Sequence, residues 1–202
     1  MLPGFLLAVA LIELTPGPNM GYLAIISGQW GRSAGFATVA GITLGLTLYM
    51  VAAAVGVAEA VLQLSWLYTG LRWAGIGYLV FLAIETWIGR EETAPGQRPG
   101  SATRKRLFTR GLVANLLNPK AAVFYVALLP GFTNPALGRI EIQALCLGVI
   151  HILVSVMVHS GIVVAAASAQ RMLDRNQIWL RRGFAMGLLG VAAWLAWSTA
   201  RP

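Results

Sequence analysis

Six apolar stretches, each about as long as a membrane-spanning helix, occupy most of this 202-residue chain. A helix needs about 20 mostly apolar residues to cross the hydrocarbon core of a bilayer. The stretches lie at residues 4–27, 36–58, 66–88, 111–132, 142–168 and 183–199. They predict an all-α integral membrane protein with six transmembrane helices, and they leave no room for a separate soluble domain.

The composition agrees with a protein embedded in the lipid bilayer. Charged residues make up 11% of the chain and hydrophobic residues 57%, whereas soluble domains carry about 25% charged residues. The single cysteine, Cys146, has no partner, which excludes a disulfide framework. The N-terminus shows neither the positive region nor the cleavage site of a secretory signal, so we expect the first stretch to be a retained span.

Two of the six stretches are interrupted by proline. Proline removes a backbone donor and clashes with the preceding turn, and a freed backbone group in lipid is costly unless protein, water or a solute satisfies it. Such a break is therefore expected to line a cavity. The predicted binding residues come from both breaks: Thr15, Pro16, Gly17, Pro18 and Asn19 in the first stretch, and Asn115, Asn118, Pro119 and Lys120 in the fourth.

The two breaks divide the chain into comparable halves. Residues 1–88 and 111–202 each contain three predicted spans, and the hydrophilic residues 89–110 connect them as a loop. Because three crossings bring the second half into the membrane from the opposite side, the halves are candidates for an inverted repeat within a single transporter domain. Interrupted spans at matching places in such halves indicate a binding site near the middle of the membrane.

The basic residues predict the orientation. The first, third and fifth connections hold eleven Lys and Arg residues, the opposite side holds three, and Lys120 lies within a span. The positive-inside rule then makes the odd connections cytoplasmic, so both termini are expected on the periplasmic side of a bacterial inner membrane. The formal charge of +8 does not indicate nucleic-acid binding, because no aromatic platform is interleaved with the basic run.

Glu13, Lys120, His151 and His159 lie inside apolar stretches, where a charge is costly unless it is paired or faces water. Glu13 precedes the first break and Lys120 follows the second, so a small zwitterion is a fitting ligand, with Glu13 as the proton or ammonium site. A structural Glu13–Lys120 pair without substrate contact is the alternative. His151 and His159 flank Ser155 and are candidates for a proton relay, although polar helix packing explains them as well.

Neither a metal nor another cofactor is expected. His151 and His159 are eight positions apart on one predicted helix, which separates the rings by about 12 Å along the axis, too far to share one ion without other ligands. Gly41-Ile42-Thr43-Leu44-Gly45 permits close helix approach. Ordinary packing within the chain is the favoured use of this motif, and a homodimer is the alternative.

Several motifs together resemble the LysE/RhtB family of amino-acid exporters. They are Thr15-Pro16-Gly17-Pro18-Asn19, the glycines Gly35 and Gly41, Gly75-Ile76-Gly77-Tyr78-Leu79, and Asn115-Leu116-Leu117-Asn118-Pro119-Lys120-Ala121. The resemblance implies efflux of amino acids or close derivatives, such as lysine, threonine, homoserine or homoserine lactone, driven by the proton motive force. Leu129-Pro130-Gly131-Phe132 departs from it, with glycine where the family usually has glutamine.

Three other classes of membrane protein are alternatives. A structural component is disfavoured, because it would have no reason to keep Glu13 and Lys120 in lipid. A membrane-embedded enzyme acting on lipid-linked substrates needs a catalytic cluster near the interface, and the sequence shows no carboxylate pair or Ser-His-Asp arrangement to supply one. A passive channel usually takes its filter from an oligomer, whereas two broken spans in one chain are more typical of a carrier.

Overall fold

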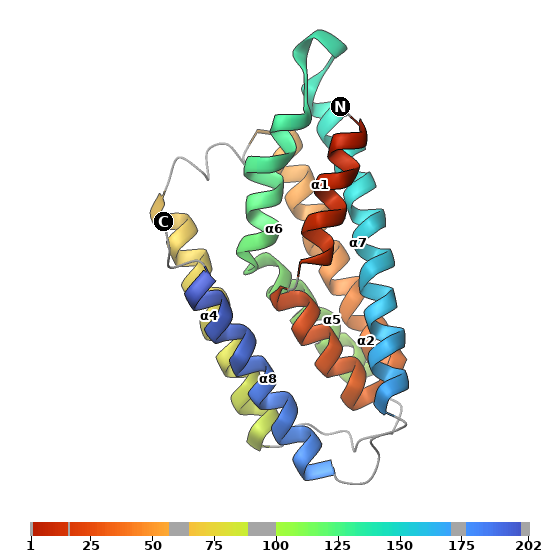
Figure 1. The fold of residues 1–202 in the computed structure, drawn as a ribbon, viewed down its shortest axis with the longest axis vertical. Coiled ribbons are helices and arrows are strands. Elements are labelled where there is room, and N and C mark those ends of the chain that lie inside the picture. The colour runs from red at the N-terminus through yellow and green to blue at the C-terminus, as the bar shows by residue number, and fades with distance from the viewer. Residues whose placement is uncertain (1, 16, 57–64, 89–99, 171–176, 199–202) are drawn as a thin grey trace.

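The computed structural model describes residues 2–15, 17–56, 65–88, 100–170 and 177–198, and every element in these ranges is helical (Figure 1). The α-helices are α1 (Leu2–Leu14), α2 (Pro18–Ala54), α4 (Ser65–Ile88), α5 (Ser101–Leu116), α6 (Pro119–Val123), α7 (Ile140–Gln170) and α8 (Gln177–Ser198). After α6 come a π-helical turn, η1 (Phe124–Leu128), and two 3₁₀ turns, η2 (Leu129–Phe132) and η3 (Pro135–Leu137). The predicted all-helical class is confirmed for the described part of the chain.

Fewer than six of the described helices qualify as membrane spans when each helix is judged by its own length and composition. Among the described residues, α2 and α7 are long and apolar enough to cross a membrane, and the pair Ser101–Leu116 and Pro119–Phe132, bent by 54°, makes a third if it counts as one span. The break after Leu14 leaves α1 with only 13 residues. The arrangement of six spans in two halves therefore stays a prediction.

Helix α2 consists of two helical stretches that meet at a kink. Gly31 has φ 77° and ψ −173° inside it, a backbone conformation that side chains with a Cβ rarely adopt. The stretch before Gly31 continues the first predicted span beyond its break, and the stretch after Gly31 corresponds to the second predicted span, residues 36–58.

The two broken segments run in opposite directions (Figure 1). In that view α1 runs from the upper end to the first break and α2 continues downward, whereas α5 starts near the lower end and α6 leaves the second break upward. Helix α2 packs mainly against α5 and α7, while α4 and α8 lie side by side and share a hydrophobic core cluster with α2 and α5. This arrangement brings both breaks to the middle of the molecule.

Glycine allows α2 and α5 to approach closely. A Cβ on Gly41 would lie 2.0 Å from the carbonyl oxygen of Phe108, and one on Gly111 would lie 2.4 Å from the carbonyl oxygen of Thr38. The Gly41–Gly45 motif thus packs within the chain, which was its favoured interpretation. A homodimer would have to use another surface and stays a prediction.

Helix α5 begins at Ser101, well before the predicted start of the fourth span at residue 111. The sequence predicts residues 101–110 as part of the connecting loop, because they include Arg104, Lys105 and Arg106. Leu107 and Arg110 are nevertheless buried, since they are three positions apart and share the face of α5 that packs on the core. Residues 89–99 of the connector lie outside the described ranges.

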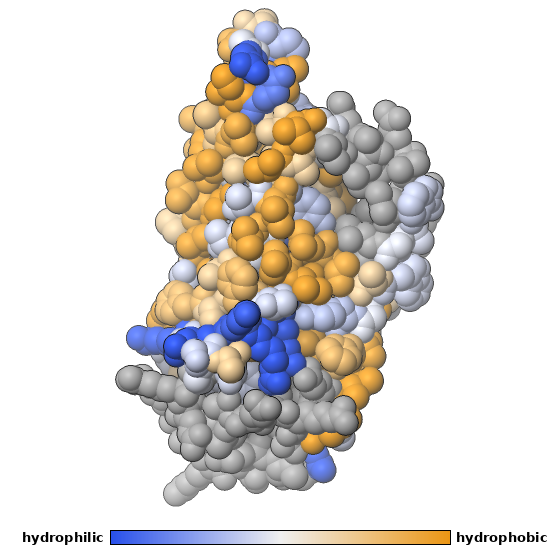
Figure 2. Space-filling model, turned by 180° about the vertical axis from the view of Figure 1, so that it is seen from behind, coloured by the Kyte–Doolittle hydropathy of each residue, from blue (hydrophilic) through white to orange (hydrophobic). Residues whose placement is uncertain are grey.

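The surface has the polarity of a membrane protein. Large apolar side chains are exposed on several helices, among them Leu7, Leu11, Leu153 and Met157. Figure 2 shows apolar residues over the middle of the rear face, with hydrophilic residues at its upper tip and in a band toward its lower end. An exposed apolar surface of this extent indicates contact with lipid or another apolar partner.

Candidate functional site

Both breaks have the same local design, in which a proline opens the second helix. Helix α2 starts at Pro18, preceded by Gly17 in an extended conformation with φ −152° and ψ 173°. Helix α6 starts at Pro119, and the side chain of Asn118 accepts a hydrogen bond of 3.0 Å from the backbone N–H of Lys120. Proline is tolerated in a first turn because its missing N–H would have no partner there. The sequence therefore ends one helix and starts another at each site.

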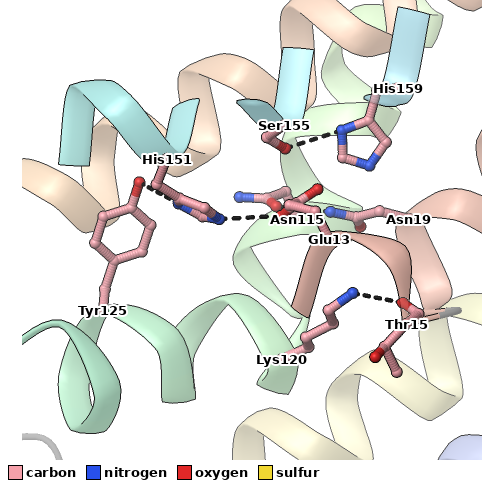
Figure 3. Close-up of polar contacts among 9 residues, drawn as sticks. All are labelled: Glu13, Thr15, Asn19, Asn115, Lys120, Tyr125, His151, Ser155 and His159. Carbon is pink, nitrogen blue, oxygen red and sulfur yellow. Dashed lines mark hydrogen bonds and ion pairs between the residues drawn. The ribbon is translucent and has the colours of Figure 1, made fainter. Parts of the chain in front are cut away.

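The two breaks meet around one small cavity between α1, α2, α5, α6 and α7 (Figure 3). Nine residues that the sequence singled out line it, namely Glu13, Gly17, Asn19, Asn115, Asn118, Lys120, His151, Ser155 and His159. Pro18 and Pro119 are buried beside it as the first residues of their helices. Pro16 is a predicted site residue outside the described ranges.

The cavity is closed to a molecule the size of an amino acid. Its free volume is about 20 Å³, and a single water needs about 10–15 Å³ on the same measure. The structure therefore has room at this point for about one water and not for an amino acid.

A hydrogen-bonded chain of three side chains crosses one wall of the cavity. His151 Nε2 lies 3.0 Å from Glu13 Oε1, and His151 Nδ1 lies 2.9 Å from the hydroxyl of Tyr125 (Figure 3). All three residues are buried. Both ring nitrogens of His151 are thereby engaged, so its neighbours determine its orientation and its tautomer.

Aromatic packing holds the same imidazole in place. The ring of Phe124 stacks on His151 with centroids 3.7 Å apart and an angle of 28° between the planes, and Tyr125 meets His151 edge to face at 5.2 Å. Phe124 and Tyr125 belong to the π-helical turn η1. Single π-helical turns are rare and frequently occur at functional sites.

Lys120 connects the two breaks directly. Its Nζ donates a hydrogen bond of 2.7 Å to the backbone carbonyl of Thr15, at the end of α1 (Figure 3). The break frees this carbonyl from the helical pattern, and the C-terminal end of a helix carries a partial negative charge that favours a cation. A Cβ on Gly17 would lie 3.3 Å from Lys120 Cδ, so the lysine stem packs closely on the first break.

The amides of Asn19 and Asn115 also join the two halves. Asn19 Nδ2 donates to Asn115 Oδ1 at 2.7 Å, and both side chains are buried. On α7, Ser155 Oγ lies 3.0 Å from His159 Nδ1. The two predicted relay histidines thus face one cavity, each with its own partner.

The charged residues of the site contact partners that the sequence does not predict. Among the described residues Glu13 pairs with His151, and Lys120 bonds to the carbonyl of Thr15 rather than to Glu13. Phe124 and Tyr125 are not among the site residues that the sequence predicts, although they contact His151. The sequence marks Tyr125 only as an aromatic residue with a hydroxyl group, six positions after Pro119. That pattern does not distinguish a site residue from an aromatic residue that anchors a helix at the membrane surface.

The described residues include no cluster of three His, Cys, Asp or Glu side chains that could hold a metal ion. The functional groups that line the cavity are a carboxyl group, two imidazoles, an ammonium, a hydroxyl and three amides, around a space that water can enter. Such a set can bind a small polar solute and pass protons, because carboxyl and imidazole groups both accept and donate protons.

Comparison with known proteins places the chain in a transport family. Residues 10–199 match the family model described as LysE type translocator. A homoserine/homoserine lactone efflux protein of Salmonella typhimurium is 32% identical over 157 residues, which cover 78% of this chain and 76% of the relative. An uncharacterized membrane protein of Vibrio cholerae is 27% identical over 198 residues, covering 98% of this chain and 96% of the relative.

A third relative, the uncharacterized membrane protein PA4757 of Pseudomonas aeruginosa, is 28% identical over 183 residues, or 88% of this chain and 82% of its own. No solved structure matches the chain. The match over almost the whole length, together with the two proline breaks that the family resemblance rested on, leads to one conclusion: this membrane protein belongs to the LysE type translocator family.

Proposed function

We propose that this chain is a secondary transporter that exports a small amino acid or a close derivative across the bacterial inner membrane. The observation that carries the proposal is the meeting of two proline-broken helices, one from each half of the chain, around a single buried polar cavity. Family membership and the efflux activity named for the Salmonella relative support the same class of function. The proposed solutes are of the threonine, homoserine or homoserine lactone type, or of the lysine type.

The proposed architecture is six spans in two inverted halves, residues 1–88 and 111–202. The opposite directions of the α1–α2 and α5–α6 segments support it (Figure 1). Transport then proceeds by alternating access, in which one half rocks against the other around a site near the middle of the bilayer. With the odd connections in the cytoplasm, both termini face the periplasm.

The proposed binding residues are those of the two breaks: Thr15, Pro16, Gly17, Pro18 and Asn19 with Asn115, Asn118, Pro119 and Lys120. Freed amides at the start of α2 and α6 suit an anionic group, and freed carbonyls at the end of α1 suit a cationic one. The closed cavity supports a cycle in which the halves separate, admit the solute and close around it.

Proton antiport is the proposed energy source, with Glu13, His151 and His159 as the coupling residues. The short contact between Glu13 and His151 supports this, because a buried carboxyl group and an imidazole 3.0 Å apart can share or exchange a proton. His159 faces the same cavity from the next turns of α7. Opening of the cavity would bring these groups to water on one side of the membrane at a time.

Flux through purified protein in proteoliposomes tests the proposal. Vesicles preloaded with radiolabelled L-homoserine should release it faster when the outside is made acidic than when the pH is equal on both sides. Release that ignores the imposed pH gradient contradicts proton coupling. Failure of a panel of amino acids to show saturable counterflow contradicts amino-acid export itself.

The same assay separates a carrier from its alternatives. A passive channel conducts without saturation and shows no counterflow, whereas a carrier exchanges labelled for unlabelled solute. An enzyme acting on lipid-linked substrates leaves the amino-acid content of the vesicles unchanged and alters their lipids. A C-terminal tag that a membrane-impermeant reagent reaches from the cytoplasmic side alone would contradict the proposed orientation.

A further inference from the structure

Two amide atoms in the wall of the cavity lack a protein partner although they are completely enclosed. They are Asn19 Oδ1 and Asn115 Nδ2, the atoms left over when Asn19 Nδ2 bonds to Asn115 Oδ1. Asn19 is 5% exposed and Asn115 is 0% exposed. One asparagine comes from the start of α2 and the other from the last turn of α5, so each half of the chain supplies one of them.

Such an arrangement is costly for stability alone. A buried polar atom without a hydrogen bond bears its full desolvation penalty, and native proteins contain few of them. Two apolar side chains of similar size would fill the same space without that penalty. The neighbouring backbone also leaves room for the amide, because a Cβ on Gly45 would lie 2.5 Å from Asn115 Nδ2. An unpaired donor beside an unpaired acceptor in a solute cavity indicates a ligand-binding function.

The donor and acceptor character does not depend on how the two amides are oriented. If both side chains were rotated so that Asn115 donated to Asn19, the unpaired atoms would be Asn19 Nδ2 and Asn115 Oδ1. One donor and one acceptor remain free in either case. The pair therefore always offers a complementary surface to a group that carries a donor and an acceptor close together.

The charged residues of the cavity are already engaged. Lys120 Nζ donates to the Thr15 carbonyl, and Glu13 Oε1 contacts His151 (Figure 3). Of the described side chains that line the cavity, only Asn19 and Asn115 present a fully buried polar atom without a protein partner. Asn19 and Asn115 can therefore contact a solute without first breaking a bond within the protein.

We propose that Asn19 and Asn115 form a neutral amide clasp for the α-amino carbonyl unit of the cargo. The free amide oxygen accepts a hydrogen bond from the α-ammonium, and the free amide nitrogen donates one to the neighbouring carbonyl or carboxylate oxygen. This inference rests on the proposed function, because it names the part of the cargo that the same cavity recognises. Recognition then requires both the amine and the carbonyl, whereas the negative charge of the carboxylate is dispensable.

Matched analogues of one amino acid test the clasp on the wild-type protein in detergent. L-homoserine carries the complete unit, L-homoserinamide keeps the amine and the carbonyl without the negative charge, 3-aminopropan-1-ol lacks the carbonyl group, and 4-hydroxybutyrate lacks the amine. We expect L-homoserine and L-homoserinamide to raise the midpoint of thermal unfolding and the other two to have no effect. Stabilisation by L-homoserine but not by its amide would overturn the clasp, because the charge would then be what the protein reads.

A double variant separates binding from structure. Asn19→Leu with Asn115→Leu removes both partners of the hydrogen bond and both unpaired atoms, so the ligand-free protein should unfold at the wild-type temperature or above it while the shift with L-homoserine is lost. Thr47→Val is the control, since the Thr47 hydroxyl bonds only to the Thr43 carbonyl one turn earlier in α2. A double variant that still shows the wild-type ligand shift would overturn the clasp.

Binding and transport are read out separately. If the analogues follow the expected pattern but L-homoserine shows no counterflow in proteoliposomes, the clasp stands and the transport function fails. If counterflow is present but only the charged acid competes with it, export stands and the clasp fails. Absence of stabilisation by homoserine and by each of the common amino acids would overturn the clasp.

Discussion

Glu13 and His151 are 138 positions apart in the chain, yet their side chains share a contact of 3.0 Å between Oε1 and Nε2. The exposed fractions of the two side chains are 8% and 2%, so the contact is enclosed by protein. It joins α1 of the first half to α7 of the second, and Tyr125 extends it to η1. Because a buried carboxyl group needs a partner, the state of this pair is linked to how the two halves pack.

Glu13→Gln should uncouple transport from the pH gradient. Glutamine keeps the size and a hydrogen-bond acceptor for His151 but binds no proton. We expect efflux driven by an acidic exterior to fall to the level of protein-free vesicles, while exchange of labelled for unlabelled solute persists. The control is Glu141→Gln, because Glu141 is exposed and faces Arg139 at 3.6 Å. Unchanged pH-driven efflux in the Glu13 variant would remove this residue from the coupling mechanism.

Tyr125→Phe should lower stability without abolishing insertion into the membrane. The substitution keeps the ring packing on His151 and removes the hydroxyl, which leaves the buried Nδ1 without its partner at 2.9 Å. We expect a loss of about 1–3 kcal/mol in the free energy of unfolding, the penalty of one buried unsatisfied group. Denaturant titration in detergent measures it. A variant as stable as the wild type would show that water replaces the hydroxyl.

Gly45→Ala should impair transport and stability together. The new Cβ would lie 2.5 Å from Asn115 Nδ2, so the amide has to move, at a cost of about 1–3 kcal/mol for overpacking a core. Gly161→Ala in α7 is the matched control, because a Cβ there meets nothing within 4 Å and replacing a helical glycine by alanine gains about 0.5–1 kcal/mol. Equal effects at both positions would contradict the close approach of α2 and α5.

Pro18→Ala and Lys120→Ala should each abolish transport while the protein still inserts into the membrane. Alanine at position 18 lacks the fixed backbone angle with which Pro18 opens α2, so the geometry of the break is less strictly defined. Loss of the lysine removes the 2.7 Å bond to the Thr15 carbonyl. Pro3→Ala and Lys105→Ala are the controls, since both residues are exposed and lie away from the cavity. Normal flux in both test variants would reduce the breaks to packing features.

The local features of the site could be predicted from the sequence because they depend on the chain next to them. Pro18 and Pro119 cannot continue the helix before them and each opens the next one, through their own backbone chemistry, wherever the rest of the chain lies. Glu13, Lys120, His151 and His159 stand out because ionisable groups in apolar stretches need a reason to be there. The membrane class and the helical fold follow from the same apolar stretches.

The polarity of the sequence gives a wrong prediction where a helix carries charged residues on its surface. The first turns of α5 read as a loop because Arg104, Lys105 and Arg106 precede the apolar run, although Leu107 and Arg110 face the core. Phe124 and Tyr125 belong to an apolar part of the sequence, and only the π-helical turn of the structure places them against His151. In both cases the direction in which a side chain faces decided its role, and that direction depends on packing.

The sequence by itself determined that this protein is helical, that it belongs in a membrane, and where its two breaks lie. Only the tertiary structure decided the partners: Glu13 with His151, Lys120 with the Thr15 carbonyl, and Asn19 with Asn115. The physical reason is that proline and apolar length act within a turn or a span, whereas these contacts join residues about a hundred positions apart. Their geometry depends on the rotation and depth at which α1, α2, α5 and α7 pack, and no local pattern specifies that.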